Sequence, residues 1–266
     1  MVQSRCLLGF IVANDGIRVD PMKIEAIVNL PLSHAVLQLQ SLQGKANFLR
    51  RFIANYVELP KGFMRLLKKG VPFVWDDQAQ RSFDTLKRAL TSTPVLQPPN
   101  YNHDFLLYLA ASDSSIGMVL VQTDDAHIEH VIYYLSKGLV GIELHYPHVE
   151  KLALAAAFVV QRFRHYILLR TTTIIFDTNP MRYILSRQIL GGQYSKWTII
   201  LQEFDLLFSS LKAKKSMVFA ELMFGLPRVS ANPVALDLLP DESLFLIDSV
   251  DPWYEYILIY LQTQRF

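Results

Sequence analysis

The chain has 266 residues, 51% of them hydrophobic, so one or two domains with a sizeable buried core are expected. No uninterrupted apolar run approaches the roughly 18 residues that a membrane-spanning helix needs, and no charged start precedes an apolar stretch, which speaks against a membrane partner and a secretory leader. Cys6 is the single cysteine, so an internal disulfide is excluded and a reducing compartment is expected.

The net charge of +2 is unevenly distributed. Residues 1–75 carry ten Lys and Arg against four acids, or +6, whereas residues 76–266 carry sixteen against twenty, or −4. A basic segment of this kind either binds phosphate groups or forms an ordinary solvated helix face. Charge alone leaves both readings open.

The first elements are predicted from turn and cap signals. An apolar strand at residues 8–12 is followed by Asp15-Gly16, a turn signal. Asp20 before Pro21 is typical of a helix N-cap, so a helix is expected to begin at residue 21. A second, amphipathic helix is predicted over residues 34–55, with Lys45, Arg50 and Arg51 on its polar face. Its apolar stripe is Val36, Leu39, Leu42, Ala46, Leu49 and Ile53.

The rest of the chain predicts a helix at 76–91, a proline-rich boundary, and then alternating strands and helices. Three adjacent strands followed by a helix and a fourth strand indicate an α/β fold with a mixed sheet and packed helices. The expected strands are 105–110, 116–122, 131–136, 171–177 and 204–211, and the expected helices are 147–165, 179–187, 195–203 and 216–224.

Four runs in this half of the chain carry a family resemblance: Phe105–Gly117, Tyr146–Ala155, Thr172–Asp177 and Val218–Leu222. In order and spacing they resemble the ribonuclease H (RNase H) domain of Ty3/gypsy-type long-terminal-repeat retrotransposon polyproteins, as found in plants. The resemblance implies a mixed five-stranded sheet with flanking helices. It also implies cleavage of the RNA strand of an RNA/DNA hybrid by two Mg²⁺ or Mn²⁺ ions held by four carboxylates.

Matched position by position, the four carboxylates of the family fall on Ala110, Leu152, Asp177 and Glu221. Two ligands have become apolar, one is retained, and one is a longer homologue. Asp177 and Glu221 are therefore the candidate catalytic and metal-binding residues, and we expect them to be vestigial. Leu152 also lies on an apolar stripe with Ala156, Val159 and Phe163, typical of a helix face packed into a core.

Neighbouring acids are poor substitutes on geometric grounds. Asp113 lies three residues from Ala110, beyond the end of the predicted strand and on its other face. Glu150 lies two residues, or about 200°, from Leu152 around the predicted helix. The paired histidines 127, 130, 145 and 148 lack a cysteine partner and are expected to be solvated loop residues.

Upstream, residues 8–24 and 42–53 resemble the end of a reverse-transcriptase palm and its thumb in the same element family. This implies four regions: palm end and thumb (1–70), connection (71–103), a degenerate RNase H-like domain (104–225) and an acidic, proline-containing extension (226–266). It also implies an intracellular location. The candidate nucleic-acid-binding residues are Lys45, Arg50, Arg51, Lys61, Arg65, Lys68 and Lys69.

These observations favour a non-catalytic fragment of a larger retroelement polymerase, acting as a structural or weakly nucleic-acid-binding module. Whether it is an enzyme stays open at this point. One alternative is an active RNA/DNA-hybrid ribonuclease with a rearranged site built from Asp177, Glu221 and either Asp113 or Glu150. Another is an element relic without a function. The polymerase metal-binding hairpin of the family is absent from these residues, so no polymerisation by this chain alone is expected.

Overall fold

The computed structural model describes most of the chain up to residue 211. All described residues lie within one compact unit, residues 1–232. Most of the predicted helices at 179–187 and 216–224, and the extension at 226–266, lie outside the described residues. Described are residues 4–31, 35–180 and 192–211, together with Ser216, Val218, Phe219 and Leu222.

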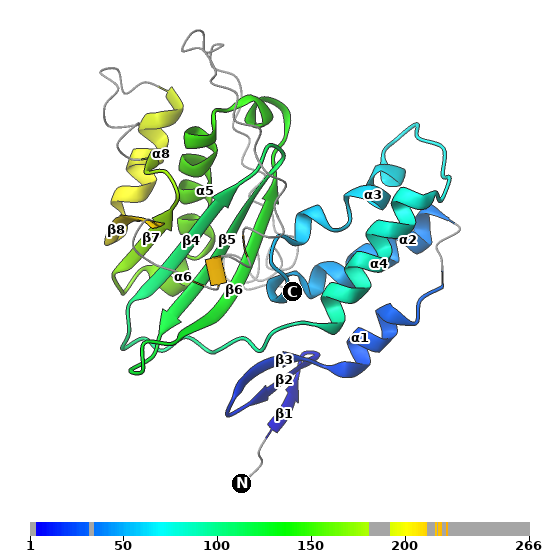
Figure 1. The fold of residues 1–266 in the computed structure, drawn as a ribbon, viewed down its shortest axis with the longest axis horizontal. Helices are drawn as coiled ribbons and strands as arrows, with labels where there is room; N and C mark the ends of the chain where they lie inside the picture. Colours follow the sequence, from blue (N-terminus) through cyan, green and yellow to red (C-terminus); the bar gives the residue numbers. More distant parts are fainter. Residues whose placement is uncertain are drawn as a thin grey trace, which may run out of the picture. The chain divides into compact units, whose positions relative to one another are not determined.

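A small antiparallel sheet and one helix form the N-terminal part (Figure 1). Gly16 opens the third strand with φ +132°, a backbone conformation that residues with a side chain rarely adopt. An added Cβ would lie 2.6 Å from the Leu96 carbonyl oxygen. The Asp20 side chain accepts the Met22 N–H at 3.0 Å, so the predicted cap is confirmed. The elements are β1 (Ser4–Leu7), β2 (Phe10–Ala13), β3 (Gly16–Val19) and α1 (Pro21–Val28).

A helical region, residues 36–91, follows. The predicted helix at 34–55 is wrong at its C-terminal end, because the α-helix stops at Phe48 and a 3₁₀ turn continues the chain. Ile53 is then extended and redirects the chain. The predicted helix at 76–91 is confirmed, with the Asp76 carboxylate accepting the Ala79 N–H at 3.0 Å. The elements are α2 (Val36–Phe48), η1 (Arg50–Phe52), η2 (Tyr56–Glu58), α3 (Lys61–Met64), η3 (Arg65–Leu67) and α4 (Asp77–Thr91).

A mixed five-stranded sheet dominates the second half, as predicted. Its order is β6-β5-β4-β7-β8, with antiparallel pairing from β4 to β6 and parallel pairing of β7 with β4 and β8. The central strand β4 is buried almost throughout, which explains its apolar sequence. The strands are β4 (Phe105–Ala111), β5 (Ser115–Thr123), β6 (Glu129–Gly138), β7 (Thr172–Phe176) and β8 (Leu206–Ser210).

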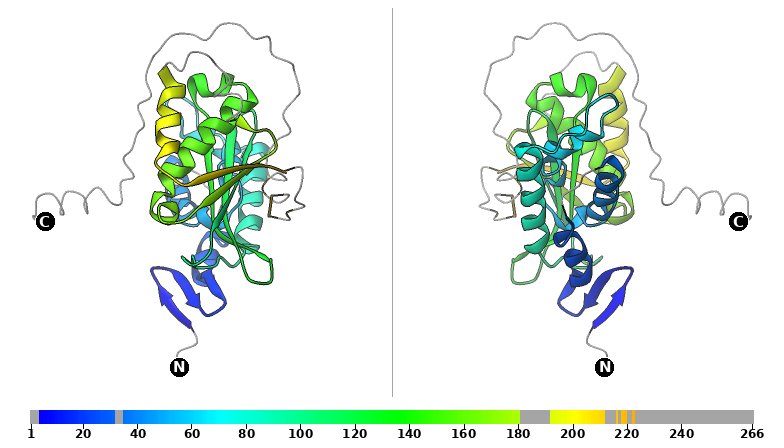
Figure 2. Two further views of the ribbon diagram at one scale, coloured as in Figure 1. Left: turned by 90° about the vertical axis from the view of Figure 1, so that its left-hand side faces the viewer. Right: turned by 90° about the vertical axis from the view of Figure 1, so that its right-hand side faces the viewer.

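Helices cover both faces of this sheet (Figures 1 and 2). The α5-side core joins Leu107, Leu109 and Ala111 of β4 to the helices α5 and α8. The helical-side core joins Tyr108 and Ala110 of β4 to the helical region. Alternate residues of one strand thus enter opposite cores. The remaining elements are η4 (Gly141–His145), α5 (His148–Arg162), α6 (Arg164–Ile167) and α8 (Gly192–Gln202).

The long helix predicted over residues 147–165 is divided. Phe163 leaves helical geometry with φ −97° and ψ 13°, and α6 continues for one turn. The predicted stripe is nevertheless buried in the α5-side core, because Leu152, Ala156, Val159 and Phe163 all pack against the sheet. A periodic pattern identified the buried face, but it carries no information on a short break that leaves the same residues buried.

Candidate functional site

The four positions matched to the family carboxylates come from different elements. Ala110 is the penultimate residue of β4 and is 3% exposed, and Leu152 lies in the first turns of α5 and is 0% exposed. Asp177 follows β7 directly. Glu221 lies outside the described residues, so its part in a site stays a prediction.

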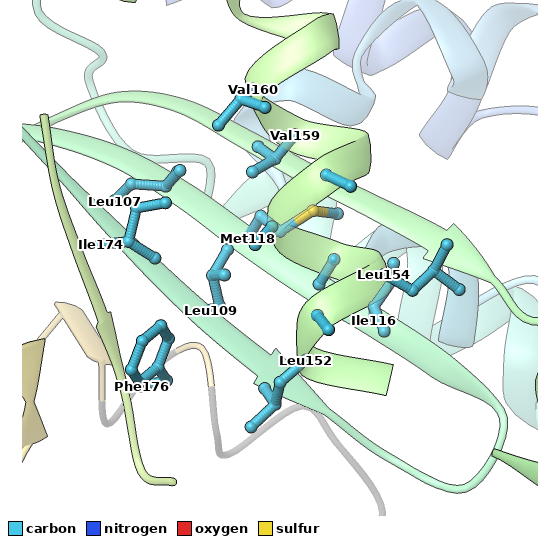
Figure 3. Packing of buried hydrophobic residues seen from close by; sticks show 14 of the residues in the cluster. Leu107, Leu109, Ile116, Met118, Leu152, Leu154, Val159, Val160, Ile174 and Phe176 are labelled. Carbon is cyan, nitrogen blue, oxygen red and sulfur yellow. The ribbon is translucent and has the colours of Figure 1, made fainter. Parts of the chain in front are cut away.

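The two apolar positions are integrated into opposite cores. Ala110 belongs to the helical-side core, and its cross-strand partner on β5 is Gly117. Leu152 belongs to the α5-side core, and Figure 3 shows its side chain over the sheet together with other core residues of α5, β4 and β7. A methyl group and an isobutyl group offer no lone pair to a cation. Neither residue is therefore a ligand, and each contributes to packing.

The retained carboxylate is paired with a histidine at the start of α5. His148 Nε2 lies 3.1 Å from Oδ2 and 3.3 Å from Oδ1 of Asp177. Burial alone would raise the pKa of the Asp177 carboxyl, but the His148 hydrogen bond and charge and the Thr178 N–H outweigh it, so the pKa falls below the ordinary 3.8. The expectation of a solvated loop histidine is wrong for His148, because β7 ends beside the first turn of α5.

The neighbouring acids do not join Asp177. Asp113 is exposed beyond the end of β4, and its carbonyl oxygen accepts the Lys151 ammonium at 2.9 Å. Glu150 is buried and accepts the Tyr194 hydroxyl at 2.6 Å, on the side of α8. Among the described residues, no three His, Cys, Asp or Glu side chains come together as a metal site.

Lys151, which precedes Leu152 in α5, is buried. Burial lowers the pKa of its ammonium group, and the nearby charge of Asp113 opposes that shift. The lysine thus holds the turn after β4 through its hydrogen bond to Asp113.

The seven candidate nucleic-acid-binding residues differ in what they already contact. Arg51 lies among three aromatic rings, 5.6 Å from Phe10, 5.7 Å from Phe52 and 5.0 Å from Tyr133. The others in structural contacts are Arg50 with Asn47, Lys61 with Glu58 and Ser114, and Arg65 with Asp76. Lys45, Lys68 and Lys69 are exposed, and no ion pair links them to another described residue.

Sequence reasoning missed two residues of the helical region that contact the sheet. Asn55 and Glu58 lie in and next to η2, yet they bond to Leu222 and to Ser114 and Ser115. Separations of 167 and 56 residues along the chain give no local pattern. The one available signal is that asparagine tolerates the left-handed conformation that Asn55 adopts, with φ 52°.

Residues 75–174 match the family model described as an RNase H-like domain found in reverse transcriptase. The chain carries an RNase H-like domain of the reverse-transcriptase type. It is 32% identical over 214 residues to the retrovirus-related Pol polyprotein from transposon 297 of Drosophila melanogaster, covering 79% of this chain and 20% of that polyprotein. The Pol polyprotein from transposon opus of the same fly is 29% identical over 252 residues, covering 89% and 25%.

A yeast relative points the same way. The transposon Tf2-3 polyprotein of Schizosaccharomyces pombe is 27% identical over 179 residues, covering 63% of this chain and 13% of that polyprotein. The chain therefore spans a quarter or less of the length of these three relatives. The similarity is to retrotransposon polyproteins, and it includes the RNase H-like domain.

Solved structures agree on the fold of this RNase H-like chain. The foamy viral protease-reverse transcriptase dRH in complex with double-stranded DNA has a TM-score of 0.70 at 19% identity, covering 80% of this chain and 38% of that one. The foamy viral protease-reverse transcriptase in complex with an RNA/DNA hybrid has a TM-score of 0.67 at 18% identity, covering 91% and 32%. At this identity the likeness establishes the architecture alone.

In the described part of the chain, no helix combines the length and the apolar character that crossing a membrane requires.

Proposed function

We propose that the chain is a non-catalytic module of a Ty3/gypsy-type retrotransposon polymerase. In this proposal a thumb and connection region is joined to an RNase H-like domain that has lost its metal chemistry. The observation that carries it is that Ala110 and Leu152, which match two ligand positions of the family, are buried packing residues. The plant origin and the intracellular location remain predictions.

The residues at the site do not fit two divalent ions. A two-metal hydrolase holds its ions about 4 Å apart, and shared carboxylate oxygens must offset their repulsion. Three of the four matched ligand positions are described: 110, 152 and 177. Of these, Asp177 alone offers a carboxylate, and it is hydrogen-bonded to His148. With Glu221 added, two acids remain where the mechanism calls for four. Mg²⁺ or Mn²⁺ is therefore no cofactor in this proposal.

Nucleic-acid binding is proposed for the helical region rather than for the lost catalytic site. Residues 1–75 carry the excess positive charge, and Lys45, Lys68 and Lys69 present it to solvent. Complexes of the foamy viral enzyme with double-stranded DNA and with an RNA/DNA hybrid support a duplex as the ligand class. Binding would be weak and governed by phosphate contacts, since no base-reading element is evident. The remainder of the polymerase is the proposed protein partner.

Fluorescence anisotropy with a labelled RNA/DNA hybrid and a DNA duplex tests this proposal. Lys68→Ala and Lys69→Ala are each expected to weaken binding. Each should also make the negative slope of log affinity against log salt shallower by about 0.9 on duplex DNA. Lys196→Ala is the matched control, because it removes one exposed charge from α8, outside the helical region. Equal effects of all three substitutions, or no binding at low salt, would contradict the proposed role.

A rearranged hybrid ribonuclease is the competing function. It needs Asp177 to act with Glu221 and with Asp113 or Glu150. Asp113 is exposed beyond the end of β4, and the Glu150 carboxylate accepts the Tyr194 hydroxyl. Hydrolysis of the labelled hybrid during the binding experiment would reveal it. An element relic would show neither binding nor hydrolysis.

A further inference from the structure

One short segment of the helical region, residues 55–58, packs against the sheet close to Ala110, the matched ligand position on β4. Asn55 is 1% exposed and donates its side-chain amide to the Leu222 carbonyl oxygen. Its Oδ1 faces Gly117 on β5, where an added Cβ would lie 2.0 Å from that oxygen. Glycine at residue 117 is therefore what makes room for the Asn55 side chain.

Gly117 is the direct cross-strand partner of Ala110. Side chains that are directly opposite in an antiparallel pair share one face of the sheet. Leu222 closes the same place, since its Cδ1 would lie 3.2 Å from a Cβ on Gly117, and it shares the helical-side core with Ala110. Asn55 and Leu222 thus cover the face to which Ala110 contributes.

The rest of the segment is fastened to two further parts of the sheet. The Val57 N–H donates to Ser136 Oγ of β6 at 3.1 Å. The Glu58 carboxylate, 12% exposed, accepts hydrogen bonds from Ser115 Oγ, from Ser114 Oγ at 3.3 Å and from Lys61 Nζ at 2.7 Å. Hydrogen bonds to a charged group are stronger than neutral ones, so Glu58 is the principal anchor.

We infer that residues 55–58 form an intramolecular latch, which docks the helical region on the sheet and closes the Ala110 face to nucleic acid and cations. The loss of two carboxylates and the presence of this cover are independent obstacles to hydrolysis. The inference goes beyond the proposed function, because it concerns an interface within the chain and stands whether or not the lysines bind a duplex. Opening of the latch exposes residue 110 while the opposite core stays closed.

Thiol labelling under native conditions tests the latch in the full chain. Cys6 is exposed and is first replaced, Cys6→Ser. Ala110→Cys then reports on the latch face, and Ala111→Cys is its matched control, since it is the next residue of β4, is similarly buried and faces the α5-side core. Each probe is combined with the natural latch, with Glu58→Ala, or with Asn55→Gly, which keeps the left-handed backbone.

The latch variants are expected to speed labelling of the Ala110→Cys probe roughly tenfold. This is the effect expected from losing hydrogen bonds of ordinary strength to a charged group. Labelling of the Ala111→Cys probe should stay unchanged. Equal acceleration of both probes would overturn the inference, because it would mean that the segment only supports the global fold. Fast labelling of the Ala110→Cys probe with the natural latch would also overturn it.

A second measurement covers the case in which a latch variant fails to fold. With the natural latch, the labelling rates of the two probes are followed at increasing urea below the unfolding transition. Local undocking exposes less surface than global unfolding, so the Ala110→Cys probe is expected to show the weaker dependence on urea. Identical dependence of the two probes would exclude a separate opening of the latch.

Discussion

Position 152 matches a carboxylate of the family and carries a buried leucine in this chain. The family carboxylate would lie in the α5-side core, where Leu152 is fully buried. We predict that Leu152→Glu destabilises the folded state by about 3 kcal/mol or more, since it removes apolar packing and buries a carboxylate without a charged partner. Urea denaturation measures this cost, with Leu152→Ala, expected at about 2–5 kcal/mol, as the cavity reference.

The pH dependence of Leu152→Glu follows from the sign of the pKa shift. Burial raises the pKa of the introduced carboxyl in the folded state above its unfolded value. The ionisation penalty is then complete above the folded pKa. It shrinks as the pH falls from that value towards the unfolded pKa, below which the carboxyl is protonated in both states. Stability equal to that of the natural chain at pH 7 would contradict the buried, metal-free environment.

At the residue scale, sequence reasoning succeeded where the local pattern of apolar residues decides whether a side chain is buried. Leu152 was expected on a helix face packed into a core, and it is a core residue. That Ala110 and Leu152 are lost ligand positions stays a prediction. His148 was misassigned because its partner Asp177 is 29 residues away. Asn55 and Glu58 were missed for the same reason, since the contacts that define them are made across the fold.

Helix packing in the helical region depends on a close approach at Gly62 of α3. An added Cβ would lie 2.1 Å from Ser82 Oγ and 2.6 Å from the Gln78 carbonyl oxygen of α4. Because one of these atoms is backbone, Gly62→Ala is expected to cost about 1–3 kcal/mol in urea denaturation. Gly44→Ala in α2 is the control, with nothing within 4 Å, and should stabilise by about 0.5–1 kcal/mol. A Gly62→Ala variant as stable as the natural chain would contradict the described contact of α3 with α4.

The N-terminus of α4 gives a pH-dependent prediction. The Ala79 N–H bond, followed by Arg65, lowers the pKa of the Asp76 carboxyl below its ordinary 3.8. A lowered folded pKa contributes stability above pH 3.8 that is lost as the pH falls through the folded value. Asp76→Ala should therefore lower the thermal midpoint at pH 7, and the difference from the natural chain should narrow below pH 3.8. A difference independent of pH would exclude the charge as its cause.

Elements were predicted well where one local signal defined them. Asp20 with Pro21 is a capping signal, and α1 begins there. The helix predicted over 76–91 is α4, Asp77–Thr91. The helix predicted over 34–55 was too long. Phe52 of η1 and the following Ile53 are buried at the spacing that a continuing α-helix would give. Hydrophobic periodicity reports which side is buried, and it does not distinguish an α-helical turn from a 3₁₀ turn.

For the molecule as a whole, the order of elements and the resemblance together predicted the mixed five-stranded sheet, and the structure confirms it. The contact between the helical region and the sheet was not predictable. It is made by η1 and η2 on β6 and by the latch residues on the turn after β4. Such contacts join residues far apart in sequence, so a pattern along the chain carries no record of them.

Hydrolysis of a labelled RNA/DNA hybrid by the natural chain, in Mg²⁺ and separately in Mn²⁺, tests the central claim most directly. The account predicts binding without cleavage in either metal, because two of the four ligand positions are apolar and buried. Asp177→Asn is the decisive companion, since it removes the retained carboxylate. Cleavage by the natural chain that disappears with Asp177→Asn would contradict the account and establish a nuclease with a rearranged site.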